Sequence, residues 1–355
     1  MNPVIEPQAQ PKQRVLWMDA LNVIATFCVV WLHANNNVHS FANTTVWRLH
    51  LIPEVLGFWA VPVFFMLSGA KLMGYRARYN TKTFLKKRFM ATMIPFLIWS
   101  FLAFIRNLAD GQYAGQNLPD LVKTFCNGIL GNELEYIFWF FIPLFAVYAC
   151  MPVLSLLKAY RRVLWYMAGL FVITCTVLPL ALQWMDLQWN DFLRFPMTYG
   201  YVGFAILGYL LSTQELDRVK RIGIYFLGFA GGIVFRTGYV LITSVQQGKV
   251  NRDLFEYLTF PVVLLGAAVF VWCKQVRWER IFQSERSVRF LAQVSACGLG
   301  VYLLHRFVLN LLWKLSGNVL KQPEWCTLVA LGVYPLCVVA IWCARRTKVG
   351  RVIVS

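Results

Sequence analysis

Four polar side chains interrupt an apolar stretch near the amino terminus and could together carry chemistry. Asp19, Asn22, Thr26 and His33 are spaced by three, four and seven residues, so on a helix they share one face. A carboxylate and an imidazole are costly in lipid, so this face should point into a bundle interior or a wet cavity. Imidazole is the usual general base for a hydroxyl near neutral pH. The stripe is a candidate catalytic face; a hydrogen-bonded helix–helix seam is the alternative.

A second polar stretch near the carboxyl terminus repeats this arrangement. Ser295, Gly298, Tyr302 and His305 are spaced by three, four and three residues, which again predicts one helical face. Arg306 follows directly and must reach the interface or find a partner. A packing seam of small residues with a hydrogen-bonded histidine is the alternative to a functional face.

Basic residues gather before the third predicted span and could bind phosphate. Lysine offers a point charge and arginine a planar fork to phosphate oxygens, whereas membrane topology and lipid headgroups explain such a cluster equally well. The cluster comprises Lys71, Arg76, Arg78, Lys82, Lys86, Lys87 and Arg88.

Four further residues stand out in the apolar stretches. Ser68 and Gly69 form a small pair that allows close helix approach or a local break. Trp139 lies in an aromatic stretch typical of a membrane interface. Arg236 falls near the middle of an apolar segment, so it requires a counter-charge. The candidates for that partner are Asp19, Glu256 or a bound anion.

The elements that must position these residues are predicted to be membrane helices. The chain has 355 residues, of which 59% are hydrophobic and 14% charged, so we expect an all-α, polytopic integral membrane bundle. A transmembrane domain over 15–344 would lie between cytoplasmic tails at 1–14 and 345–355. A short amphipathic helix at 117–131 should lie at the interface. The predicted spans are 15–34, 51–74, 89–109, 135–157, 163–182, 195–213, 221–243, 254–274, 292–315 and 325–344.

Charge placement sets the expected topology. With ten spans, the tails and loops on one side carry 24 Lys and Arg residues against eight on the other, which predicts both termini in the cytoplasm. The net charge of +18 sits mainly in loops, which disfavours nucleic-acid binding and suits anionic headgroups or a phosphorylated ligand. The nine cysteines are scattered without a C-x-x-C pair, so neither a disulfide framework nor a metal site is expected.

Taken in order, these stretches resemble the membrane-bound acyltransferase-3 family, and most closely its stand-alone surface-polysaccharide O-acetyltransferases. The resemblance spans the chain and rests on an ordered set of motifs. The matching residues are Asp19 to Ala25 with His33, Pro62 to Gly69, Lys86 to Arg88 with Ile94 to Phe96, and Ser295, Gly300, Val301, Tyr302 and His305. Two positions depart from the family pattern, since Asn22 replaces a motif arginine and Gly298 a motif serine. Arg236 is a candidate substitute for that arginine.

The resemblance implies transfer of an acyl group, usually acetyl, from cytoplasmic acyl-CoA to a sugar hydroxyl of an envelope glycan or its lipid-linked precursor. It also implies a bacterial inner-membrane location, contact with membrane lipids and no permanently bound cofactor. A covalent acyl intermediate on His33 or Ser68 is an alternative to direct transfer. A transporter or flippase for a lipid-linked sugar, or a non-catalytic relative, are the competing functions.

On this basis each candidate residue receives an expected role. His33 is the expected general base, with Asp19 or another acceptor orienting it, although fourteen helical residues separate the two by roughly 21 Å. His305 would bind the acceptor or stabilise an oxyanion. The acyl-CoA site is expected at Lys86, Lys87, Arg88 and Ser68, and the substrate site at Asn22, Trp139, Arg236 and Tyr302.

Overall fold

The computed structural model describes residues 15–190, 193 and 200–354, so the predicted amino tail at 1–14 lies outside it. All regular secondary structure in this part of the chain is helical, which confirms the predicted all-α class. The first helices are α1 (Leu16–Ala34), α2 (Thr45–Gly57), α3 (Ala60–Leu72), α4 (Thr81–Ala109), α5 (Leu118–Gly131), α6 (Phe141–Leu156), α7 (Arg161–Phe171) and α8 (Leu178–Trp184). The others are α9 (Tyr201–Thr213), α10 (Arg218–Leu227), α11 (Arg236–Gln247), α12 (Phe260–Gln275), α13 (Glu285–Ala296), α14 (Gly298–Leu315), α15 (Cys326–Ala344) and α16 (Lys348–Val354).

The helices have the lengths and composition of a membrane protein. Among the described residues, seven continuous helical stretches are long and apolar enough to cross a bilayer. α13 and α14 meet at a bend of 58° and would together form an eighth, while α9 and α12 are shorter apolar helices. Each of the ten predicted ranges overlaps one of these elements. The integral-membrane class is therefore confirmed, whereas the count of ten spans and the side of the termini remain predictions.

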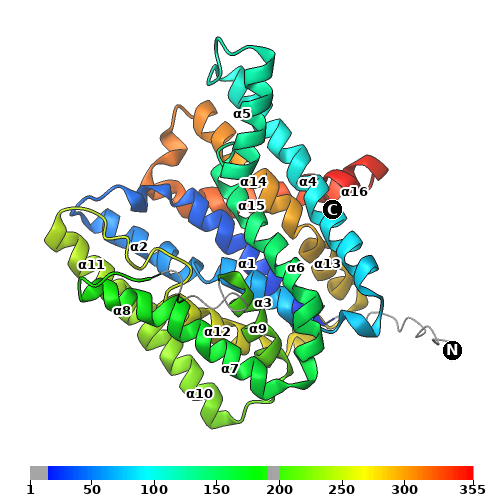
Figure 1. Cartoon of the computed structure of the whole chain (residues 1–355). Helices are drawn as coiled ribbons and strands as arrows, with labels where there is room; N and C mark the ends of the chain where they lie inside the picture. The colour runs from blue at the N-terminus through cyan, green and yellow to red at the C-terminus, as the bar shows by residue number, and fades with distance from the viewer. Residues whose placement is uncertain (1–14, 191–192, 194–199, 355) are drawn as a thin grey trace, which may run out of the picture.

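Helix α1 runs through the middle of the bundle (Figure 1) and contacts α2, α3, α12, α13, α14 and α15. Asp19 and Thr26 are buried along it, together with Leu21, Ala25 and Val29. At these two positions the predicted polar stripe faces other helices rather than lipid. A central helix with a polar face can therefore join sites built by helices that are far apart in sequence.

Helices α3 and α9 pack with their backbones in contact. A Cβ atom added at Gly69 would lie 1.8 Å from the carbonyl oxygen of Ala205, and one at Gly208 would lie 2.1 Å from that of Met66. Only glycine fits at these two crossing points. The small pair Ser68–Gly69 therefore serves close approach, and α3 continues through it without a break.

Replacing Gly69 by alanine should destabilise the protein. The new methyl group would force α3 and α9 apart, at a cost of about 1–3 kcal/mol or more. Thermal unfolding of the purified protein in detergent measures the loss. Gly74→Ala is the matched control, because a Cβ there meets nothing within 4 Å. Equal melting temperatures for the two variants would contradict the packing described here.

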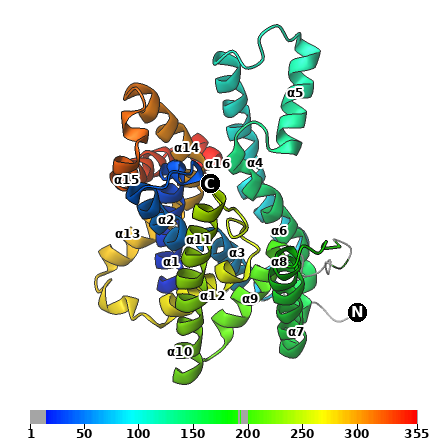
Figure 2. The same ribbon diagram turned by 90° about the vertical axis from the view of Figure 1, so that its left-hand side faces the viewer.

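Two peripheral helices complete the fold. α5 forms where an amphipathic helix is predicted, with Asn117 accepting a hydrogen bond from the Asp120 amide at 3.0 Å. Figure 2 shows α5 and the end of α4 projecting beyond the other helices. The predicted carboxyl tail contains α16, which the sequence analysis did not anticipate. α16 packs against α4, where the Trp99 indole donates a hydrogen bond to the Ile353 carbonyl at 3.1 Å.

Candidate functional site

The two predicted histidines, 272 positions apart in the chain, lie side by side. His33 Nδ1 on α1 is 2.7 Å from His305 Nε2 on α14. Their rings are nearly parallel, with an interplanar angle of 20° and centroids 4.9 Å apart. His305 is fully buried, and its Nδ1 lies 3.1 Å from the Val301 carbonyl oxygen. The structure thus joins the two polar stripes at one point.

The hydrogen bonds of this pair determine which nitrogen is basic. A carbonyl oxygen can only accept, so His305 Nδ1 must carry the hydrogen that Val301 receives. Nε2 of a neutral His305 then has a lone pair and accepts from His33 Nδ1. A neutral His33 consequently keeps its lone pair on Nε2. This nitrogen is the one that can take a proton from a substrate.

Asp19 and Asn22 belong to a different hydrogen-bond network from His33. The Ser295 hydroxyl donates to Asp19 Oδ1 at 2.8 Å. The Asn22 amide donates to the Ser295 carbonyl at 2.8 Å. This network ties α1 to the end of α13, just before the bend into α14. His305 contacts His33 directly and corresponds to the other acceptor that the sequence analysis allowed in place of Asp19.

The two departures from the family motifs are neighbours in space. A Cβ atom at Gly298 would lie 3.0 Å from Asn22 Nδ2 and 3.2 Å from Thr26 Oγ1. Asn22, which is shorter than the motif arginine, and Gly298, which lacks the side chain of the motif serine, therefore lie at one contact between α1 and α14. Asn22 uses its amide to hold Ser295, so it is engaged in the fold at this position.

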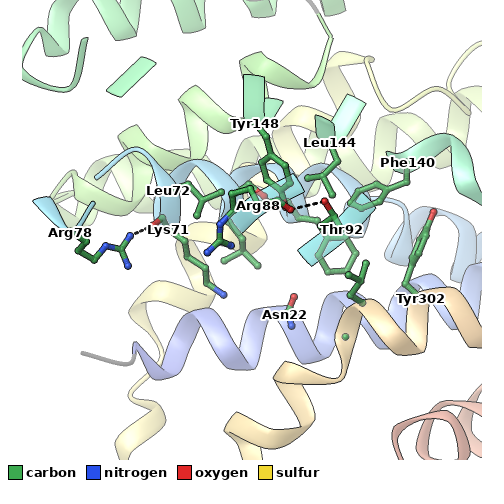
Figure 3. A pocket seen from close by; sticks show the side chains of 15 residues that line it. Asn22, Lys71, Leu72, Arg78, Arg88, Thr92, Phe140, Leu144, Tyr148 and Tyr302 are labelled. Atoms are coloured by element: carbon green, nitrogen blue, oxygen red, sulfur yellow. Dashed lines mark hydrogen bonds between the residues drawn. The ribbon is translucent and has the colours of Figure 1, made fainter. Parts of the chain in front are cut away.

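A cavity of about 280 Å³ opens between α1, α3, α4, α6 and the start of α14 (Figure 3). Three cations line it, Lys71, Arg78 and Arg88, and the lining contains no acidic residue. Figure 3 shows the Lys71 and Arg88 side chains extending toward Asn22 from the opposite wall. The other lining residues are Phe64, Leu67, Ser68, Leu72, Thr92, Phe140, Leu144, Tyr148, Gly298, Leu299 and Tyr302.

The chemistry of this lining suits a ligand with an anionic end and an apolar arm. Arg88 Nε is buried and has no hydrogen-bond partner among the described residues, so a ligand or a water molecule can supply its acceptor. Arg78 donates to the Lys71 carbonyl at 3.2 Å, which fixes its position at one end of the cavity. The Ser68 hydroxyl faces its own helix and donates to the Phe64 carbonyl at 2.9 Å.

The members of the predicted basic cluster lie in three different environments. Arg88 lies on the cavity as expected, whereas Lys86 and Lys87 are exposed on another face of α4. Arg76 is used in the fold, where it donates to the Ser155 hydroxyl at 2.7 Å. Thr92 also lines the cavity and was not among the predicted site residues, although it follows Arg88 by one helical turn and shares its face.

Tyr302 connects the cavity with the histidine pair. It lines the cavity, and its ring centroid lies 5.8 Å from that of His305. Its hydroxyl donates a hydrogen bond to the Ile137 carbonyl oxygen, and the Phe140 ring lies 5.1 Å away. Tyr302 therefore forms the end of the cavity nearest to the histidines.

Trp139 lies outside the cavity, in an aromatic cluster. Its ring stacks on Tyr257 with centroids 5.4 Å apart and an interplanar angle of 22°. The Tyr201 ring lies 5.6 Å from it on another helix. The cluster brings the segment before α6 against α9 and the loop that precedes α12.

Arg236 is 1% exposed and has partners that the sequence analysis did not name. Its Nε donates to the Leu254 carbonyl at 3.0 Å and its Nη1 to the Glu54 carbonyl at 3.4 Å. The Glu54 carboxylate, on a residue only 3% exposed, lies within electrostatic range of the guanidinium. The proposed pairing with Asp19 or Glu256 is wrong, and these contacts do not place Arg236 at Asn22 as a substitute for the motif arginine.

Comparison with known proteins identifies the relationship of this chain. A family model described as an acyltransferase domain, Acyl_transf_3, matches residues 15–343. The chain is also 25% identical over 315 residues to a serine/alanine racemase of Enterococcus gallinarum, across 82% of its own length. It spans about 40% of the length of that relative. No solved structure matches it. The family match includes every helix that lines the cavity or carries the histidine pair.

Proposed function

Because the chain belongs to the acyltransferase-3 family, we propose that this membrane acyltransferase takes its acyl group from acyl-CoA. The acyl group is acetyl in the simplest case. The acceptor is a sugar hydroxyl of a cell-surface glycan or its lipid-linked precursor, and the membrane is the bacterial inner membrane. The observation that carries the proposal is the cavity with three cations at one end and Tyr302, next to the histidine pair, at the other.

The cavity supports acyl-CoA as the donor. Lys71, Arg78 and Arg88 offer positive charge to the phosphates, and the unpaired Arg88 Nε offers a donor for a phosphate oxygen. The apolar wall formed by α3, α6 and α14 suits the extended arm that carries the thioester. With the cationic end at the cytoplasmic face, the thioester reaches toward Tyr302 while the phosphates stay at the entrance.

His33 is the general base of the proposed reaction. Its Nε2 takes the proton of the acceptor hydroxyl while the hydroxyl oxygen attacks the thioester carbon. The carbon–sulfur bond breaks, and the proton passes from His33 to the leaving thiolate. His305 accepts a hydrogen bond from His33 Nδ1 throughout, so it orients the base and supports its positive form. Direct transfer is favoured over acylation of Ser68, because that hydroxyl is bonded to its own helix.

Replacing Arg88 by alanine should raise the KM for acyl-CoA by about 10- to 150-fold, the loss expected for one charge-assisted hydrogen bond. The turnover number should change much less, because Arg88 binds the donor at a distance from the histidines. Initial rates of acyl transfer at varied acyl-CoA concentration measure both constants. Lys86→Ala is the control, since this exposed lysine lies half a turn away on α4. If Lys86→Ala raised the KM as much as Arg88→Ala, the cavity would not be the donor site.

A further inference from the structure

Arg306 follows His305 directly and has no part in the reaction described so far. Its guanidinium carbon lies 5.0 Å from the ring centroid of Tyr136 and 5.0 Å from that of Trp313. Only 16% of the side chain is exposed. The Tyr136 ring also meets the His33 ring edge to face, with centroids 5.6 Å apart. A positively charged group is thus held between two aromatic rings beside the catalytic base.

Three buried hydrogen-bond donors in this cluster lack an acceptor. Arg306 Nε, Arg306 Nη1 and Trp313 Nε1 are buried and make no hydrogen bond within the described part of the chain. The carboxylate of Glu135 is 3.7 Å from Arg306 Nε, beyond hydrogen-bond distance. Its other oxygen is held by Arg106 at 2.8 Å. Buried donors of this kind are costly unless a ligand or water supplies the acceptor.

The charge around these donors is positive. Arg106 and Arg306 share the single carboxylate of Glu135. Lys321 adds a third cation, with its Nζ 5.6 Å from the Trp313 ring centroid. The excess positive charge favours an anion over a neutral ligand, and the planar guanidinium matches the paired oxygens of a carboxylate or phosphate.

We propose that Arg306 and Trp313 bind an anionic group of the acceptor and so place its hydroxyl beside His33. The inference rests on the proposed acyl transfer and narrows its acceptor to a sugar with a nearby oxyanion. A carboxylate on an acidic sugar or the phosphate that joins a sugar to its lipid carrier would both supply it. Arg306 lies within electrostatic range of His33, so the bound anion stays close to the base.

Binding of small sugars to the purified full chain tests this site without requiring turnover. The protein is placed in phosphatidylcholine nanodiscs, and dissociation constants are measured for glucuronate, glucose 1-phosphate and glucose. At least one anionic sugar should bind tenfold or more tightly than glucose. Preference for glucuronate would identify a carboxylate and preference for glucose 1-phosphate a phosphate. Equal binding of all three, or no binding by either anion, would overturn the proposal.

Three variants assign the preference to Arg306. Arg306→Gln should remove the discrimination between anionic and neutral sugars, and Arg306→Lys should retain part of it. Lys314→Gln, at an exposed position of α14, should leave it unchanged. A melting temperature equal to that of the native protein shows that each variant is folded. A preference that survives Arg306→Gln in folded protein would place the anion elsewhere.

Two further measurements distinguish a lipid-binding site from an acceptor site, and failure of the proposed donor from failure of the proposed anion site. Replacing part of the phosphatidylcholine by phosphatidylglycerol should leave sugar binding unchanged. If the anionic lipid instead weakens it competitively, the site holds a lipid headgroup and the acceptor assignment is wrong. If native protein fails to bind acetyl-CoA, the donor side of the proposed function fails, whereas the anion preference is still measured directly.

Discussion

Replacing His33 by alanine is expected to lower the turnover number for acyl transfer by about 10²- to 10⁴-fold, the usual contribution of a positioned general base. Its Nε2 is the only basic nitrogen that the hydrogen bonds of the pair leave available, because His305 Nε2 already accepts from His33. The KM for acyl-CoA should change little, since His33 does not line the cavity that we propose for the donor. Steady-state kinetics at saturating acceptor separate the two constants.

The control for this variant is His39→Ala, which removes an exposed histidine from the short helix after α1. The electrostatic effect of His39 on His33 is weaker than those of His305 and Arg306. This control should leave turnover within about twofold of native, a bound reflecting the small effects usual for surface substitutions. His305→Gln should fall between the two, because it disturbs the orientation of the base without removing it. A His33→Ala enzyme that turns over as fast as the His39→Ala enzyme would show that another group takes the proton.

Replacing Arg236 by methionine is expected to lower the free energy of unfolding by about 3–5 kcal/mol, the cost of leaving a buried charge without its partner. The Glu54 side chain is 3% exposed, and Arg236 is the cation within its electrostatic range. The variant also leaves the Leu254 carbonyl without the donor that it has in the native protein. Denaturant unfolding in detergent micelles, or thermal unfolding where the former is irreversible, measures the effect.

A double variant separates charge from packing at this position. Adding Glu54→Gln to Arg236→Met should recover a large part of the loss, because the remaining side chain is then neutral. Arg289→Met provides the surface control, since both partners of the Arg289–Glu285 pair are more than 70% exposed. This control should cost under about 1 kcal/mol. If Arg236→Met cost no more than Arg289→Met, the Glu54–Arg236 pair would not stabilise the fold.

The sequence predicted the faces of the helices well, because helical periodicity alone determines them. The burial of Asp19 and Thr26 on α1, and of Tyr302 and His305 on α14, follows from spacings of seven and three. Ser295 is also buried, but it lies on α13 before the 58° bend, so the single helical face predicted from Ser295 to His305 is interrupted. Periodicity does not determine which helices pack against each of these faces. The contact between His33 and His305 depends on how α14 crosses α1 after the bend that ends α13, and no local pattern marks that crossing.

The partners of isolated charges were harder to predict for the same reason. The candidate partners of Arg236 in the sequence are Asp19, Glu256 or a bound anion. Its observed partners are backbone carbonyls and the charge of Glu54, which the end of α2 brings to α11. A carbonyl can be supplied by any residue, so sequence alone cannot identify it.

In the basic cluster, residues that are adjacent in the sequence do not lie on the same face of the helix. Lys86, Lys87 and Arg88 are consecutive, but helix α4 turns each of them to a different side. Only Arg88 reaches the cavity, where it joins Lys71 and Arg78 from earlier segments. Grouping the residues by helical face, with Thr92 one turn after Arg88, would have identified this part of the cavity wall.

The most direct test of the account is transfer of labelled acetyl from acetyl-CoA in membranes that contain the native chain. Label is followed into the lipid-linked glycan fraction, with membranes lacking the chain as the reference. The account predicts label in that fraction only when the chain is present, together with release of one CoA thiol for each acetyl group transferred. Movement of a lipid-linked sugar without such release, and no transfer from acetyl-, succinyl- or longer acyl-CoA, would contradict it.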